Sequence, residues 1–270
     1  MTAALYLVAT PIGNLEDITL RALRVLREAD LVACEDTRQT GKLLAHFGVD
    51  KPMVSYHDHN EAARTRELVA KLEAGASIAL VSDAGTPLVS DPGYRLVTAA
   101  IAAGIPVVPI PGASAVLGAL AAAGLPTDAF RFCGFLPAKA GQRKKALEEL
   151  RGEDCTMIFY EAPHRILDTL ADIAAVYGQR PVVVARELTK LHEEFLRGTA
   201  EEVRAQLAAR TSVKGEIALV IGKGSVVVAD TPVDQAVREL EQKGVPRMDA
   251  IKQVARERGL SKREVYRQVT

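Results

Sequence analysis

The chain has 270 residues, of which 48% are hydrophobic and 25% charged, a composition typical of a globular protein with room for a sizeable buried core. Lysine and arginine together number 34, as do aspartate and glutamate, so the overall charge does not indicate a nucleic-acid partner and only local patches could. The three cysteines, Cys34, Cys133 and Cys155, are widely separated and lack metal-ligand spacing. This pattern excludes a disulfide framework and favours a cytoplasmic location.

Neither of two apolar stretches predicts a membrane segment. The run Leu5–Ala9 follows no basic region and is too short for a signal peptide, so we expect it to be a first strand. Residues 96–127 carry no charge, but Pro106, Gly112 and Gly118 are among the breakers that interrupt them. A helix, a buried strand and another helix explain that stretch better, and we expect no membrane association.

The first half of the chain alternates short apolar runs with helix-period patterns. We expect strands at Leu5–Ala9, Leu31–Cys34, Pro52–Tyr56, Ile78–Val81 and Val107–Ile110. We expect helices at Ile18–Glu28, Gly41–Phe47, Glu61–Glu73, Tyr94–Ala103 and Ala113–Ala123. Such alternation is typical of βαβ units, so residues 1–124 are predicted to form an α/β domain with a mainly parallel sheet.

A second α/β domain is predicted for residues 125–228, beginning at the breaker Gly124-Leu-Pro126. We expect strands at Phe130–Phe135, Thr156–Tyr160, Val182–Ala185, Glu194–Arg197 and Ile217–Ile221. We expect helices at Ala140–Leu150, His164–Val176 and Ala200–Ala209. Two of the strands, around Val182 and Phe195, follow each other without a helix between them, which indicates a mixed sheet.

The tail, residues 229–270, has a different character. Two helical patterns surround Gly244-Val-Pro246, and a third follows Ser261. From Lys243 to Arg267 basic residues outnumber the acidic Asp249, Glu257 and Glu264. The pattern predicts a basic, helical extension that resembles a helix-turn-helix. Its basic face would either contact RNA phosphates or form an ordinary solvated surface, and the sequence leaves both open.

Three loops rich in glycine and proline follow strands of the first domain: Thr10-Pro-Ile-Gly-Asn14, the stretch Ser82–Gly93, and Pro109-Ile-Pro-Gly-Ala-Ser114. In a parallel sheet these loops lie at the same edge, where ligands bind. None contains a GxGxxG fingerprint or a phosphate-loop lysine. We therefore expect a cavity that binds its ligand through backbone groups and suits a neutral or zwitterionic nucleoside better than a polyphosphate.

Several charged segments could serve either function or structure. Glu35-Asp-Thr-Arg38 follows the second strand, and Arg38 could bind phosphate or simply pair with a neighbour near a helix cap. Glu161-Ala-Pro-His-Arg165 is expected to begin a helix, with Pro163 in its first turn. The connector Arg186–Glu194 is dense in charge. His57-Asp-His59 lacks a third ligand nearby, so we expect no metal site.

Together these motifs resemble one family, the ribosomal RNA small subunit methyltransferase I family of 16S rRNA cytidine 2′-O-methyltransferases, within the tetrapyrrole methylase superfamily. The resemblance extends from about Leu5 to Gly224. It is carried by Val8–Thr19, Glu35–Arg38, Val81–Gly93, Pro109–Gly112, Gly134–Pro137, Phe159–Arg165, Arg186–Lys190 and Lys214–Glu216.

The resemblance implies two α/β domains with S-adenosylmethionine bound in the cleft between them, a homodimer, and 16S rRNA of the 30S ribosomal subunit as the substrate. It also implies cofactor contacts from both domains. By motif matching these fall on Pro11, Asp83, Ala84, Gly85, Thr86, Val89, Ser114, Ala115, Glu161 and Leu188. Tetrapyrrole-modifying relatives show Gly-Asp-Pro where this chain has Gly85-Thr-Pro87, a departure that favours the rRNA branch.

Transfer of a methyl group to a ribose hydroxyl needs positioning and an acceptor for the hydroxyl proton, but no metal. The sequence offers four acceptor candidates, Asp83, Glu35, Asp36 and Glu187. Candidates for binding RNA phosphates are Arg38, Arg165, Lys190, Lys262 and Arg263. Two alternative functions stay open, a methyltransferase acting on a tetrapyrrole and a catalytically silent RNA-binding protein.

Overall fold

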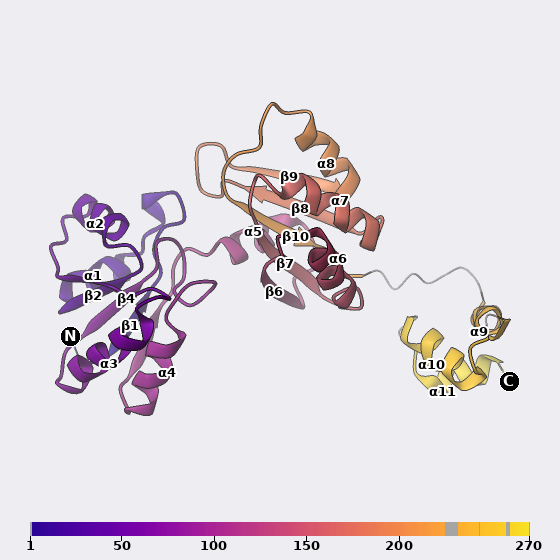
Figure 1. Cartoon of the computed structure of the whole chain (residues 1–270), viewed down its shortest axis with the longest axis horizontal. Helices are drawn as coiled ribbons and strands as arrows, with labels where there is room; N and C mark the ends of the chain where they lie inside the picture. Colours follow the sequence, from indigo (N-terminus) through magenta and orange to yellow (C-terminus); the bar gives the residue numbers. More distant parts are fainter. Residues whose placement is uncertain (1, 225–231, 243, 258–259, 270) are drawn as a thin grey trace.

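The protein contains two five-stranded sheets, each with its own helices, followed by a group of short C-terminal helices (Figure 1). The structure, a computed structural model, describes residues 2–224, 232–242, 244–257 and 260–269. The two sheets with alternating helices confirm the expected α/β fold class. In the described residues no helix is both long enough and apolar enough to cross a membrane.

The first sheet is entirely parallel, with the strand order β3-β2-β4-β1-β5. Its strands are β1 (Leu5–Val8), β2 (Leu31–Cys34), β3 (Met53–Ser55), β4 (Ile78–Val81) and β5 (Val107–Ile110). Its helices are α1 (Leu20–Glu28), α2 (Thr37–His46), α3 (Glu61–Glu73) and α4 (Tyr94–Ala102), and a short 3₁₀ turn spans Leu15–Asp17. All five expected strands and these helices are present, with small shifts at their ends.

Successive side chains of each strand point to opposite faces of this sheet, and helices cover both faces. On β4, Ile78 and Leu80 pack in one cluster with Leu68 of α3 and Leu96 of α4. Their neighbours Ala79 and Val81 pack in a second cluster, with Val25 and Leu26 of α1 and Leu44 of α2. Every residue of β4 is buried, as expected for the central strand of a parallel sheet. The loop that follows β4 is therefore anchored to the buried centre of the sheet.

The second sheet is mixed, with the order β6-β7-β10-β8-β9, in which only the β6–β7 pair is parallel. Its strands are β6 (Phe130–Phe135), β7 (Thr156–Glu161), β8 (Pro181–Arg186), β9 (Glu194–Thr199) and β10 (Ile217–Ile221). Helices α6 (Ala140–Glu149), α7 (Ile166–Tyr177) and α8 (Ala200–Ala208) contribute to the core on one face. The expectation of a mixed sheet is confirmed.

The other face of the second sheet is covered by α5 (Ala115–Ala123), the helix that follows the last strand of the first sheet. Ala119 and Leu120 pack there in one cluster with Ile158, Val183 and Val220. Arg197 of β9 donates to the carbonyl oxygens of Ala122 at 2.6 Å and Ala123 at 3.2 Å, which satisfies the C-terminal end of α5. The chain thus passes from one sheet to the other just before α5 begins.

Three short helices pack on one another at the C-terminal end: α9 (Val233–Gln242), α10 (Arg247–Glu257) and α11 (Lys262–Val269). They share a small core of Val237, Ala250, Ile251, Val254, Ala255 and Val265. Ser261 and Glu264 form a reciprocal cap at the start of α11, since each backbone N–H bonds the other residue's side chain. The domain boundaries near residues 124 and 228 stay predictions, and residue 228 lies outside the described residues.

Two of the helix starts that differ from the sequence-based expectation have identifiable local reasons. Helix α2 begins at Thr37 and not Gly41, because the Asp36 side chain accepts a hydrogen bond from the Arg38 backbone N–H at 2.8 Å and caps the helix. Helix α7 begins at Ile166, and Pro163 lies in the turn before it and not in its first turn. The Glu161 carboxylate accepts from the Ala162 N–H at 2.7 Å, which shapes this turn.

Candidate functional site

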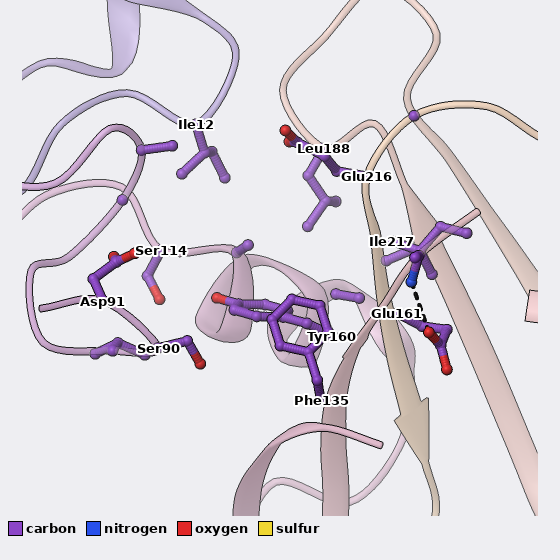
Figure 2. Close-up of a pocket in the computed structure, with 18 of the residues that line it drawn as sticks. Ile12, Ser90, Asp91, Ser114, Phe135, Tyr160, Glu161, Leu188, Glu216 and Ile217 are labelled. Carbon is purple, nitrogen blue, oxygen red and sulfur yellow. Dashed lines mark hydrogen bonds between the residues drawn. The ribbon is translucent and has the colours of Figure 1, made fainter. Parts of the chain in front are cut away.

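A cavity of about 420 Å³ lies where the loops of the first sheet face the second sheet (Figure 2). The first sheet supplies Ile12, Ala84, Gly85, Thr86, Val89, Ser90 and Asp91, and the segment entering α5 adds Ser114 and Ala115. The other wall consists of Phe135, Tyr160, Glu161, Ala162, Pro163, Ala185, Leu188, Gly215, Glu216, Ile217 and Ala218. A volume of this size suits a small molecule of the size of a nucleoside or cofactor.

The three loops expected at this edge are tied directly to one another. Thr10 and Gly85 form an isolated bridge, in which each backbone N–H donates to the other's carbonyl at 2.9 and 3.0 Å. The Thr10 hydroxyl also donates to the Ser82 carbonyl at 3.1 Å. The Thr86 hydroxyl donates to the Ala113 carbonyl at 3.3 Å and so joins the third loop. The expectation that these loops meet at one edge of the sheet is confirmed.

Backbone strain is concentrated in two loops that face the cavity from opposite sides. Four residues other than glycine have a positive φ in the described residues: Leu88 at 72°, Ser90 at 67°, Glu187 at 53° and Thr189 at 67°. The first two flank Val89 and the last two flank Leu188, and both flanked residues line the cavity. Such conformations cost about 1–3 kcal/mol each and persist where the surrounding structure requires them, often at binding sites. The strain therefore marks this cavity as a candidate functional site.

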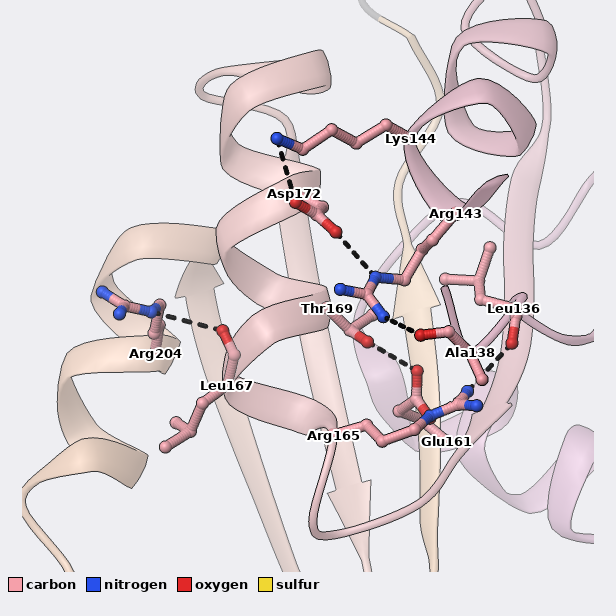
Figure 3. Close-up of polar contacts among 10 residues, drawn as sticks. All are labelled: Leu136, Ala138, Arg143, Lys144, Glu161, Arg165, Leu167, Thr169, Asp172 and Arg204. Carbon is pink, nitrogen blue, oxygen red and sulfur yellow. Dashed lines mark hydrogen bonds and ion pairs between the residues drawn. The ribbon is translucent and has the colours of Figure 1, made fainter. Parts of the chain in front are cut away.

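Most of the residues expected to contact a cofactor lie at this cavity. Eight of them line it: Ala84, Gly85, Thr86, Val89, Ser114, Ala115, Glu161 and Leu188. Pro11 and Asp83 are the chain neighbours of lining residues and do not themselves line it. The Glu161 side chain is fully buried and turned toward α7, where it accepts hydrogen bonds from Arg165 at 2.8 Å and Thr169 at 2.6 Å (Figure 3). A role for these residues in cofactor binding stays a prediction.

The four proton-acceptor candidates lie outside the lining, and three of them are engaged elsewhere. Asp36 caps α2 and pairs with Arg38, whose hydrogen bonds hold the pKa of Asp36 at about 2. Asp83 accepts a hydrogen bond from the Asp36 backbone N–H at 3.1 Å. Glu187 accepts hydrogen bonds from Lys190 at 2.9 Å and from the Glu216 N–H at 3.0 Å, and these lower its pKa. Each of these three carboxylates therefore has a structural role, either within its own loop or between two loops.

The fourth candidate, Glu35, has a different environment. Burial raises the pKa of the Glu35 carboxyl, and the nearby charge of Asp83 raises it further. Glu35 forms no ion pair within the residues that the structure describes, and it does not line the cavity. It contributes negative charge to the region behind the loop that follows β4.

The basic residues expected to bind phosphate lie in different environments. Arg165 donates to Glu161 and to the Leu136 carbonyl at 2.9 Å, so its guanidinium is used within the second domain. Lys190 bridges Glu187 and Glu216. Arg38 pairs with Asp36 but has a largely exposed side chain. Lys262 and Arg263 are exposed on α11. The structure thus leaves Arg38, Lys262 and Arg263 accessible, and does not bring them together at the cavity.

The cavity residues that were not among the site residues expected from the sequence include Asp91, Phe135 and Tyr160. Phe135 is 60% exposed and lies against Tyr160, with ring centroids 5.6 Å apart at an interplanar angle of 61°. The Tyr160 hydroxyl points toward the wall that carries Asp91 and Ser114 (Figure 2). The aromatic residue in the motif Gly134-Phe-Leu-Pro137 was the available signal, but the sequence alone did not show that its ring reaches the cavity.

The chemistry of the lining is largely apolar, with carboxylates but without basic side chains. Asp91, Glu161 and Glu216 are the acidic residues of the lining. Small residues such as Ala84 and Gly85 leave backbone groups accessible to a ligand. Such a wall suits a neutral, zwitterionic or positively charged ligand and does not suit a polyphosphate. Within the described ranges no cluster of three or more His, Cys, Asp or Glu residues has the arrangement to hold a metal ion.

Comparisons with known proteins point to one family. The family model of the Tetrapyrrole (Corrin/Porphyrin) Methylases matches residues 4–204. The chain is 52% identical to "Ribosomal RNA small subunit methyltransferase I" of Halalkalibacterium halodurans, over 97% of this chain and 93% of that protein. It is 51% identical to the protein of the same description from Synechocystis, over 97% and 95% of the two chains.

The fold also matches solved structures. A structure of uroporphyrin-III C-methyl transferase from Thermus thermophilus, complexed with S-adenyl homocysteine, aligns with a TM-score of 0.54 and 21% identity. The alignment covers 81% of this chain and 97% of that one. At this level of identity the match supports the shared two-sheet fold alone.

Proposed function

The chain belongs to the tetrapyrrole methylase family, and from this premise we propose that it is an S-adenosylmethionine-dependent methyltransferase that modifies RNA of the small ribosomal subunit. Relatives about half identical over nearly the full length carry that description. The observation that carries the proposal is the cavity between the sheets, which has strained walls, no basic lining residue and the exposed aromatic ring of Phe135. These features suit a charged nucleoside cofactor beside an unstacked base.

The lining residues fit S-adenosylmethionine. This cofactor supplies an electrophilic methyl group on a positively charged sulfur. The backbone around Ala84, Gly85 and Ser114 offers hydrogen-bonding groups for its amino-acid portion, and the apolar wall at Leu188 and Ile217 offers a surface for its adenine. The carboxylates of the wall favour its positive charge. No bound metal is needed to polarise either partner, since charge disperses during the transfer.

The finer specificity is part of the same proposal. We expect the target to be the 2′-hydroxyl of a cytidine in 16S rRNA, as the motif resemblance implies, and a cytoplasmic homodimer to be the working form. Thr86 supports the rRNA branch over a tetrapyrrole substrate: it stands where tetrapyrrole-modifying relatives have an aspartate, and its hydroxyl is used in bracing Ala113. The cavity therefore lacks a carboxylate at the position that distinguishes the tetrapyrrole branch.

A labelling experiment tests the proposed function directly. The protein is incubated with methyl-labelled S-adenosylmethionine and, separately, with 30S subunits, naked 16S rRNA and a precorrin-type tetrapyrrole. We expect label on a cytidine ribose of 16S rRNA, located by nuclease digestion and mass spectrometry. Label on a base or on the tetrapyrrole would contradict the proposal, and failure to bind the cofactor by calorimetry would favour a silent RNA-binding protein.

We expect Phe135→Ala to lower kcat/KM for the RNA substrate about tenfold, because stacking of a base on an aromatic ring is worth about 1–3 kcal/mol. Cofactor affinity, measured by calorimetry, should change little. Phe130→Ala is the matched control, since Phe130 is 46% exposed on the same strand but does not line the cavity. Equal losses in the two variants would show that the effect comes from the strand and not from stacking.

The basic face of α11 is testable by the salt dependence of RNA binding. Replacing both Lys262 and Arg263 with alanine removes two exposed positive charges. If both contact phosphates, the slope of log K against log salt concentration should fall by about 0.7–0.9 for each residue. Lys144→Ala/Lys145→Ala, on α6 of the second domain, provides a control of the same charge change. An unchanged slope in the α11 variant would mean that this face is only solvated surface.

A further inference from the structure

Three carboxylates line the cavity, and their surroundings separate them. Glu161 is fully buried and bonded to Arg165 and Thr169. Glu216 pairs with Lys190 at 3.1 Å and is 76% exposed. Asp91 forms no ion pair in the part of the chain that the structure describes. Among the acidic residues of the wall, Asp91 is therefore the one with a carboxylate that is not already neutralised.

The backbone holds Asp91 in a defined position. Ser90, the residue before it, has a φ of 67°, and Pro92 follows it with a fixed φ. Gly93 then enters α4 with a φ of 139°, where an added Cβ would lie 3.0 Å from side-chain atoms of Leu80 and Leu88. Because the backbone is constrained on both sides of Asp91, the residue is held in a defined position on the cavity wall. A group that reacts with a bound substrate needs such a fixed position.

Three titratable groups and one hydroxyl surround the Asp91 carboxyl and influence its charge state. Burial raises the pKa of Asp91, a hydrogen bond with the Ser82 hydroxyl partly offsets this, and the nearby charges of Glu35 and Asp83 raise it, so that the pKa is about 6. From the opposite wall Tyr160 faces it, and burial together with the Asp91 charge raises the pKa of Tyr160. A carboxylate with a raised pKa is a stronger base than an ordinary aspartate and is still mostly ionised at neutral pH.

We propose that Asp91 is the group that accepts the proton of the substrate hydroxyl during methyl transfer. This role rests on the proposed function. As the ribose oxygen forms its bond to the methyl carbon, the carbon–sulfur bond breaks and its electron pair stays on sulfur. The hydroxyl proton passes to the Asp91 carboxylate, which later releases it to solvent. Charge and atoms balance without any further reactant, and Asp91 replaces the four acceptors expected from the sequence.

The first part of the test compares Asp91→Asn with the wild-type protein on 30S subunits. We expect the single-turnover rate at pH 8 to fall by about 10²–10⁴-fold, the usual contribution of a positioned base. Cofactor affinity by calorimetry should stay within about threefold. The wild-type kcat/KM should rise with pH and level off above about 6, and the variant should lack this step. Asp154→Asn, an exposed residue outside the cavity, is the matched control.

The second part measures stability without substrate or cofactor. The folded pKa of Asp91 lies above the unfolded value of 3.8, so its contribution destabilises the wild-type fold as pH rises from about 4 to about 6 and stays constant above that. Asp91→Asn should therefore raise the melting temperature at pH 8 and have a smaller effect at pH 4. A residue that only braces the loop would instead lower the melting temperature at both pH values.

The outcomes distinguish the two proposals. If wild-type protein labels no rRNA, the proposed function fails, whatever the variant does. If wild-type protein labels rRNA and Asp91→Asn keeps more than about a third of its rate, the assignment of Asp91 is overturned. It is also overturned if the variant loses cofactor affinity and stability in parallel with its rate. Loss of rate with retained affinity and a higher melting temperature at pH 8 supports it.

Discussion

Replacing Gly215 with alanine is expected to weaken S-adenosylmethionine binding about 100-fold, a loss of about 2.7 kcal/mol. Gly215 lines the cavity with a φ of 93°, and a Cβ there would overlap the Glu187 side chain. Glu187 cannot move freely, since it is bonded to Lys190 and to the Glu216 N–H. The added methyl group would therefore displace the strained turn that presents Leu188 to the cavity.

Calorimetry on the purified variant measures this loss, with Gly141→Ala as the matched control. Gly141 lies in α6 of the same domain, and a Cβ there would have no atom within 4 Å. We expect the control to bind the cofactor normally and to be slightly more stable, because alanine favours the helix. If Gly215→Ala bound within about threefold of wild type, the strained turn would not be part of the binding surface.

Glu161→Ala is expected to reduce the free energy of unfolding by about 3 kcal/mol, because it leaves the mostly buried Arg165 guanidinium without its partner. The Thr169 hydroxyl and the Ala162 N–H also lose their acceptor. Denaturant unfolding followed by circular dichroism measures the change. Arg165 would keep only the Leu136 carbonyl as a partner (Figure 3).

The double variant Glu161→Ala/Arg165→Met separates structure from function at this position. Removing both charges should recover much of the lost stability, because no unpaired charge remains in the core. If the carboxylate is only structural, the double variant should bind S-adenosylmethionine as tightly as the wild type. Weak binding by a stable double variant would instead show that the Glu161 carboxylate contacts the cofactor.

The bounds of several strands were well predicted, because continuous apolar runs mark where these strands begin and end. The strands Leu31–Cys34, Ile78–Val81, Val107–Ile110 and Ile217–Ile221 have the bounds expected from their apolar runs. Helix ends were less accurate where a side chain decided the start. Asp36 caps α2 through the Arg38 N–H, and no apolar periodicity extends that far toward the N-terminus.

One wall of the cavity could be predicted from topology, whereas the other was predicted only in part, where the motif resemblance indicated Glu161 and Leu188. The wall from the first sheet follows from topology alone, since the loops after β1, β4 and β5 must meet at one edge of a parallel sheet. The wall from the second sheet depends on how Tyr160, Ala185 and Ala218 come together across antiparallel strands far apart in sequence. No local pattern encodes that meeting.

The role that we assign to Asp91 was hidden for a related reason. Its neighbours Ser90, Pro92 and Gly93 are common turn residues, so composition alone describes a turn. Its surroundings become visible only in three dimensions, where Glu35 comes from the end of β2 and Tyr160 from the second sheet. A functional carboxylate in a turn differs from a structural one by what faces it, and distant segments supply that.

The position of β10 has a consequence for the order in which the protein can fold during its synthesis. β10 lies between β7 and β8, so until residue 221 has been made the second sheet exists only as two separate strand pairs. Helix α5 is made about 100 residues earlier, and part of the surface that it covers belongs to β10. The apolar face of α5 can therefore be fully covered only after β10 has been synthesised. A nascent chain halted shortly before β10 should therefore expose α5, while its first sheet, complete at β5, can already be folded.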